Sequence, residues 1–88
     1  METVMMRKTA FEAIVERLEN PDNAVLYTKL KANHDKNGID ILWYVCRMKN
    51  MLSAIDSEKN FSSKKIYEDS FDASIREVVK MLDSEGWK

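Results

Sequence analysis

The strongest constraint on the fold is a helical repeat of apolar residues between Ser63 and Glu85. Apolar side chains recur there every three or four positions, at Tyr67, Phe71, Ile75, Val78 and Leu82. That spacing places them on one face of an α-helix. Ser62 or Ser63 is suited to cap its first turn, and Gly86 suits the left-handed residue that closes a helix. Trp87 is then free to fold back onto the last turn.

A second helical pattern covers residues 3–19. Its apolar positions are Val4, Phe11, Ile14, Val15 and Leu18. Pro21 ends the pattern, because proline disfavours helical geometry in the residue before it. Two amphipathic helices therefore bracket the middle of the chain.

The middle of the chain carries a third helical pattern, over residues 40–57. Its apolar positions are Ile41, Val45, Met48, Leu52 and Ile55. Before it, Asp22 would cap a shorter helix that carries Val25, Leu26 and Leu30. This interpretation gives the chain four helical segments.

Residues 24–46 also allow a different interpretation. The segments 24–32 and 39–46 flank Asn37-Gly38, and Asn-Gly between two apolar runs is a strong hairpin signal. The second segment is also rich in strand formers. A lone hairpin is only marginally stable, however, and the helical period continues unbroken through Ile55. Helices are therefore preferred, and the hairpin stays as the alternative.

These patterns predict a single domain over residues 1–88, an all-α compact bundle of three to four helices. The alternative is an α+β fold with a central β-hairpin at about residues 24–46. Two Gly and one Pro in 88 residues are too few for a loop-rich all-β protein. A chain this short buries a thin core, so an oligomer that shares its core would follow naturally.

The residue types that usually carry catalysis are scarce. The only histidine, His34, and the only cysteine, Cys46, cannot supply the ligands of a zinc site. Cys46 lies in an apolar run, where we expect a buried small hydrophobe rather than an activated thiol. Two glycines cannot build a phosphate-cradling loop. We therefore expect no catalysis, no cofactor and no metal site. The remaining enzymatic alternative would centre on Cys46 or His34.

The most informative residues for function lie on a second side of the helix predicted over 40–57. Trp43, Tyr44, Arg47 and Met51 form a stripe nearly opposite the first apolar stripe. Trp, Tyr, Arg and Met are the residue types enriched at the centres of protein interfaces. One interpretation is that this stripe packs against the other helices. The other is that it binds a partner protein or a second copy of the chain.

A local positive charge supports an alternative function. Residues 29–49 contain five basic and two acidic side chains, in a chain whose net charge is −1. Lys29, Lys31, Lys36 and Arg47 in this segment, beside aromatic residues, could hold a nucleotide or a nucleic acid by ion pairing and stacking. The overall charge argues against this, because domains that hold nucleic-acid backbone usually read far more basic.

The sequence also bears on location. Residues 1–8 are not followed by the apolar core of a signal peptide, and no apolar stretch approaches about 18 residues. A single cysteine in an apolar run fits a reducing compartment. We expect a cytoplasmic protein with no membrane association. Its expected function is that of a non-catalytic protein-binding module that self-associates. Regulators, inhibitors, immunity proteins and phage-encoded modulators of host machinery are common among proteins of this size.

Overall fold

Every regular element in residues 3–88, the part of the chain described by the computed structural model, is a helix. The elements are α1 (Thr3–Glu19), the short 3₁₀-helix η1 (Pro21–Asn23), α2 (Ala24–Asn37), α3 (Ile41–Ser57) and α4 (Phe61–Ser84). The predicted all-α class is confirmed. The alternative with a β-hairpin at residues 24–46 is wrong, because those residues form α2, a short turn and the start of α3.

Gly38 is the reason that Asn37-Gly38 joins two helices here. Its φ of 70° ends α2 and redirects the chain, a conformation that glycine reaches without steric cost. Two residues later Asp40 begins α3, and the helical period of the apolar residues continues through Ile55. The same dipeptide suits a hairpin or a helix–helix turn, so the periodicity of the flanking residues decides between them.

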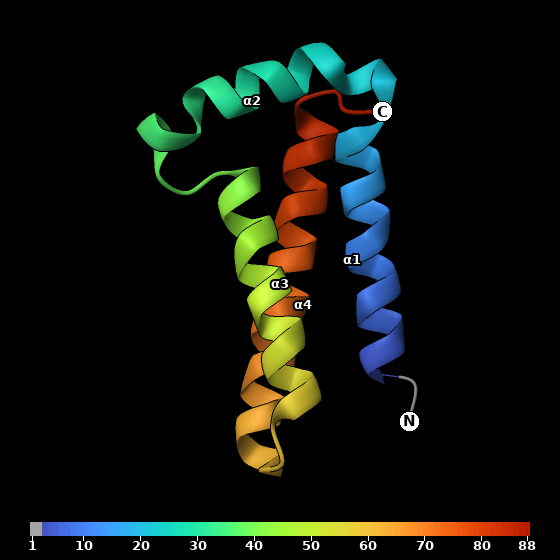
Figure 1. Cartoon of the computed structure of the whole chain (residues 1–88), viewed down its shortest axis with the longest axis vertical. Helices are drawn as coiled ribbons and strands as arrows, with labels where there is room; N and C mark the ends of the chain where they lie inside the picture. Colours follow the sequence, from blue (N-terminus) through green and yellow to red (C-terminus); the bar gives the residue numbers. More distant parts are fainter. Residues whose placement is uncertain (1–2) are drawn as a thin grey trace.

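Three long helices build the body of the molecule. α1, α3 and α4 lie lengthwise beside one another, and α2 crosses one end of them (Figure 1). α1 and α4 run in the same direction, and α3 runs the opposite way. The buried core comes from these three helices and the residues after α4: Ile14, Leu18, Ile41, Met48, Ile55, Phe71, Val78, Leu82 and Trp87. The predicted apolar stripes supply this core, with the side chain of Val4 outside the described residues.

Helix starts depart from two sequence expectations. α4 begins at Phe61 because Asn60, rather than Ser62 or Ser63, accepts the backbone N–H of Ser63 through its side chain at 3.1 Å. Asp22 does not cap α2. Pro21 instead opens η1, where the Asn20 side chain accepts the Asp22 N–H at 2.9 Å. Short polar residues crowd both places, so several of them are chemically suited to the cap and the chain path selects one.

Arg7 connects α1 to α4 through hydrogen bonds to a carboxylate. Arg7 donates from Nε and one terminal nitrogen to the two carboxylate oxygens of Asp72, each at 2.9 Å. This hydrogen bond raises the pKa of the Arg7 guanidinium above its usual value, against the opposing effect of burial. A base with a raised pKa contributes its stabilisation below its unfolded pKa and loses it as the pH rises through the folded pKa. The Arg7 cation therefore keeps its contact with α4 up to strongly alkaline pH.

The residues after α4 are held at the junction of α1 and α2. Gly86 has a φ of 80°, as its position after the helix predicted, and Trp87 is 4% exposed. Arg17 donates to the Trp87 carbonyl at 2.8 Å, and the Lys88 N–H donates to the Asn23 side chain at 2.8 Å. The end of the described chain is thus part of the packed structure.

Neither α4, at 24 residues the longest helix, nor any other helix in residues 3–88 has the length and apolar character needed to cross a membrane.

Candidate protein-binding surface

The first turn of α3 is held by a buried carboxylate. Asp40 is 6% exposed, and its Oδ1 accepts the backbone N–H of Trp43 at 2.9 Å. His34 on α2 lies against the same group, with Nδ1 2.9 Å and 3.0 Å from the two carboxylate oxygens. A carboxylate at the start of a helix also complements the positive end of the helix dipole. Asp40 therefore fixes the turn that carries Trp43 and joins it to α2.

Trp43 forms contacts with two neighbours on the same helix. The Arg47 guanidinium lies over its indole ring, with Cζ 5.3 Å from the ring centroid. The Tyr44 ring meets the indole edge to face, with centroids 5.0 Å apart and planes at 87°. Both geometries are favourable for an aromatic ring, whose face is negative and whose edge is positive. The three side chains thus form one ordered cluster.

The predicted second stripe of α3 divides between the core and the surface. Tyr44 and Met51 are partly buried and pack against the core. Trp43 is half-buried outside the core cluster, and Arg47 is exposed. The structure therefore brings Trp43, Tyr44 and Arg47 together and leaves Met51 further along the helix.

An open groove of about 400 Å³ runs beside this cluster between α3 and α4. We call it the α3–α4 groove; its lining residues are Ile39, Trp43, Tyr44, Arg47, Ser70, Ala73, Ser74 and Glu77. Ile39 is 61% exposed, although it is a large aliphatic residue. Three of the four α4 residues on the groove, Ser70, Ala73 and Ser74, have short side chains, so this side leaves room for a bulky group from a partner.

The helical patterns of the sequence did not indicate the residues that α4 and the Gly38 turn add to this groove. Ile39 follows Gly38 directly, and an apolar residue at a turn is a signal that was available in the sequence. Ala73 and Glu77 carry no such signal. Their place beside Trp43 depends on how far α4 is shifted along α3, which the helical periods alone do not determine.

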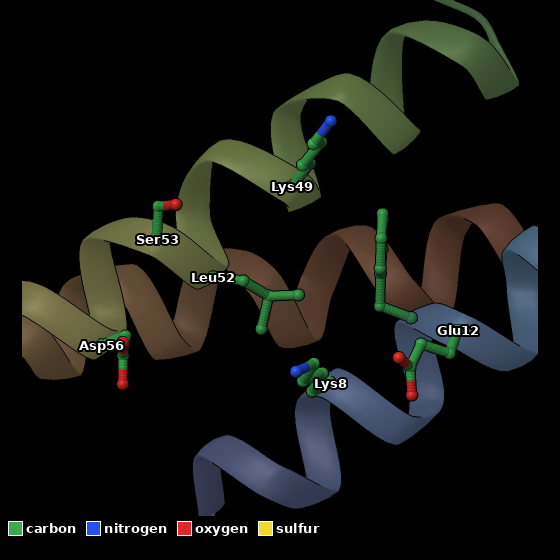
Figure 2. A pocket seen from close by; sticks show the side chains of 7 residues that line it. Lys8, Glu12, Lys49, Leu52, Ser53 and Asp56 are labelled. Atoms are coloured by element: carbon green, nitrogen blue, oxygen red, sulfur yellow. The ribbon is translucent and has the colours of Figure 1, made fainter.

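A second groove, of about 420 Å³, lies between α1 and α3 (Figure 2). Its lining residues are Lys8, Phe11, Glu12, Lys49, Leu52, Ser53 and Asp56. Leu52 points into the space between the helices, and Lys49 points away from α1. Its apolar members, Phe11 and Leu52, pack against the core. Two cations and two carboxylates at its rim favour no single sign of ligand, so this groove is the weaker candidate.

The basic residues of the nucleotide-binding alternative lie on two helices and have different surroundings. Lys29 lines a small pocket that also holds the carboxylates of Asp40 and Glu85. Lys31 lies over the Tyr27 ring, with Nζ 5.6 Å from the centroid, and Lys36 is exposed near the end of α2. Arg47 is the cation over Trp43 on α3. Carboxylates beside Lys29 disfavour a phosphate there, since like charges repel.

The two residues considered for catalysis occupy different settings. Cys46 is exposed on α3, which corrects the expectation of a buried thiol. The helix is covered by α1 and α4 on only part of its circumference, so an apolar run does not make all its members core residues. His34 contacts the cap carboxylate of Asp40. Among the described side chains, no group of three or more His, Cys, Asp or Glu could hold a metal ion.

Comparison of the chain with known protein families, curated proteins and solved structures finds no match.

Proposed function

We propose that the protein is a small, non-catalytic protein-binding module of the regulator or inhibitor type that acts in the cytoplasm. The observation that carries this proposal is the Trp43–Arg47 stack, which lies outside the core on a groove beside the exposed Ile39. Trp and Arg are the residues that most often dominate binding energy at protein interfaces. Their position at the rim of a groove gives a partner both an apolar contact and a charged one.

The stack also lowers the cost of binding. A free arginine side chain loses rotamer freedom when a partner orders it, at about 0.5–1.5 kcal/mol for such a side chain. Arg47 already rests on the indole, and the backbone of Trp43 is held by Asp40. Less ordering remains to be done at the moment of association. Among the lysines of the nucleotide-binding alternative, Lys31 also lies over an aromatic ring, that of Tyr27, but the pocket that Lys29 lines includes neither Lys31 nor Lys36.

The first test compares Trp43→Ala with Ile66→Ala, a control that removes an exposed apolar side chain on α4 outside the groove. Each protein is immobilised, and the chains it captures from a lysate, its own included, are quantified by mass spectrometry. We expect Trp43→Ala to lose about tenfold or more of the capture, equivalent to ~1.4 kcal/mol or more of binding energy. Ile66→Ala should retain it.

Equal capture by the wild type and Trp43→Ala would contradict the proposal. Far-UV circular dichroism must show the same helicity in both proteins. A loss of helicity in Trp43→Ala would mean that the indole supports the fold, and Arg47→Ala then becomes the deciding variant, because its side chain is exposed.

A further inference from the structure

The α3–α4 groove carries one cation and one carboxylate, on opposite walls. Arg47 belongs to α3 and Glu77 to α4, and both are exposed. Neither forms an ion pair with another described side chain; the recorded contact of Arg47 is the one with the Trp43 ring. Both charges are therefore available to pair with charges on a partner.

The charges also lie toward opposite ends of the groove. α3 and α4 run antiparallel (Figure 1), so Glu77, late in α4, lies toward the end marked by Ile39. Arg47, two turns after Ile39, lies toward the end marked by Ser70. Trp43 is between Ile39 and Arg47. A partner that matches this groove must therefore present an acid opposite one end and a base opposite the other, with an apolar centre.

The groove itself has this pattern. A two-fold axis that lies in the plane of contact, passes midway between Arg47 and Glu77 and is perpendicular to the line joining them sets each Arg47 opposite the Glu77 of the other copy. Contacts of this kind come in reciprocal pairs, as a two-fold interface requires. We propose that the α3–α4 groove binds the same groove of a second copy, in a symmetric dimer held by two Arg47–Glu77 pairs across the interface and by Trp43 at its centre.

This inference rests on the proposed function and names the partner of the same surface. The charges of the groove are complementary to those of the same groove on a second copy. A second copy therefore supplies the acid, the base and the apolar centre that the groove requires of a partner. Charged pairs across an interface fix the register of the two partners more than they add raw affinity. Reversing one of these charges should therefore disrupt the dimer. Reversing the charge that faces it on the other chain should restore the dimer.

The experiment is sedimentation equilibrium on the full chain over a wide concentration range. The wild type should approach twice the chain mass of 10.3 kDa. Arg47→Glu and Glu77→Arg, each alone, should raise the dimer Kd by about tenfold or more, because each sets like charges opposite one another twice. An equimolar mixture of the two variants should recover dimers, since one chain then carries two carboxylates and the other two guanidinium groups at these sites.

Matched controls change net charge equally, away from the groove. Lys49→Glu lies in the groove between α1 and α3, and Glu16→Arg lies on α1. Both should keep the wild-type Kd. A pairing of Arg47 with Glu77 within one chain would not be recovered by mixing, so the mixture isolates the contact between chains.

Two results would overturn the inference. One is a wild type that stays at the monomer mass at every concentration, and the other is a mixture no more dimeric than either variant alone. If Trp43-dependent capture of a different protein persists in either case, the surface binds a foreign partner and the proposed function stands. If that capture is absent as well, both proposals fail.

Discussion

Asp40 connects more of the local structure than any other polar residue near the candidate surface. Its buried carboxylate caps α3 through the Trp43 N–H and contacts His34 on α2. One side chain thus caps the start of α3 and contacts α2. The geometry around Trp43 depends on a residue that does not itself line the groove.

Two substitutions at this position separate the cap from the charge. Asp40→Ala should lower the free energy of unfolding by about 1–3 kcal/mol, because the cap is lost and buried groups are left unpaired. Asp40→Asn keeps an oxygen able to cap and should cost less. Urea denaturation of both variants gives the two values. Equal losses would show that the charge facing His34, and not the cap, carries the effect.

At the residue scale, the sequence predicted which side chains cluster better than it predicted which side chains are exposed. Trp43, Tyr44 and Arg47 were singled out together, and the structure places them in one cluster. Cys46 was expected to be buried and is exposed. Helical spacing gives the angle of a residue around its own helix, whereas exposure depends on which angles other helices cover. That second quantity is a property of the assembled bundle.

At the element scale, the helical repeat of apolar residues predicted the helices well where the repeat covered many residues. The bounds of α1 and α3 follow from their apolar stripes, and Asp40 was recognised as the start of the third helical segment. The start of α4 at Phe61 was not recognised. Phe61 is exposed and lies off the apolar stripe, so nothing in the repeat marks the first turn. The sequence also does not predict the orientation of α2 across the end of the bundle, because a turn at Gly38 is compatible with more than one angle between α2 and α3.

Gly38 offers a test of that turn. No atom lies within 4 Å of the position where a Cβ would be added, but the φ of 70° is one that side chains rarely adopt. Gly38→Ala should therefore lower the free energy of unfolding by about 1–2 kcal/mol through backbone strain alone. Thermal unfolding followed by circular dichroism measures it. Ala32→Gly, at an exposed position inside α2, is the helix-propensity control, with an expected loss of about 1 kcal/mol. An unchanged stability in Gly38→Ala would mean that the turn relaxes freely.

At the scale of the whole molecule, Asn23 is the polar residue that connects segments far apart in the sequence. It is 1% exposed, donates to the Arg17 carbonyl at 2.6 Å and accepts the Lys88 N–H at 2.8 Å. One amide therefore joins the end of α1, the start of α2 and the residues after α4. No sequence pattern predicts this role, because Asn in a Pro-Asp-Asn stretch is ordinary turn composition.

Removing that amide should destabilise the entire fold. Asn23→Ala removes the partner of the part-buried Lys88 N–H and leaves the Arg17 carbonyl with only the longer bond from the Asn20 N–H, so we expect a loss of about 1–3 kcal/mol in the free energy of unfolding. Asn33→Ala removes an exposed amide that donates to the Lys29 carbonyl within α2, and should cost about 0.5 kcal/mol or less. Chemical denaturation of both proteins decides the matter. Similar small losses would show that Lys88 finds another acceptor.

The contacts made by Arg17 and Asn23 also set an order of events during translation. α1 leaves the ribosome first, but its partners come last. Arg17 donates hydrogen bonds to Asp83 and to the carbonyl of Trp87, and Asn23 accepts one from the Lys88 N–H. α3 and α4 are neighbours in the chain and can pair as soon as both emerge. α1 can pack against α3 once α3 has emerged, but its contacts with α4 form only after the end of α4 has left the exit tunnel. The side of α1 that faces α4 therefore stays accessible to chaperones until the residues after α4 have emerged.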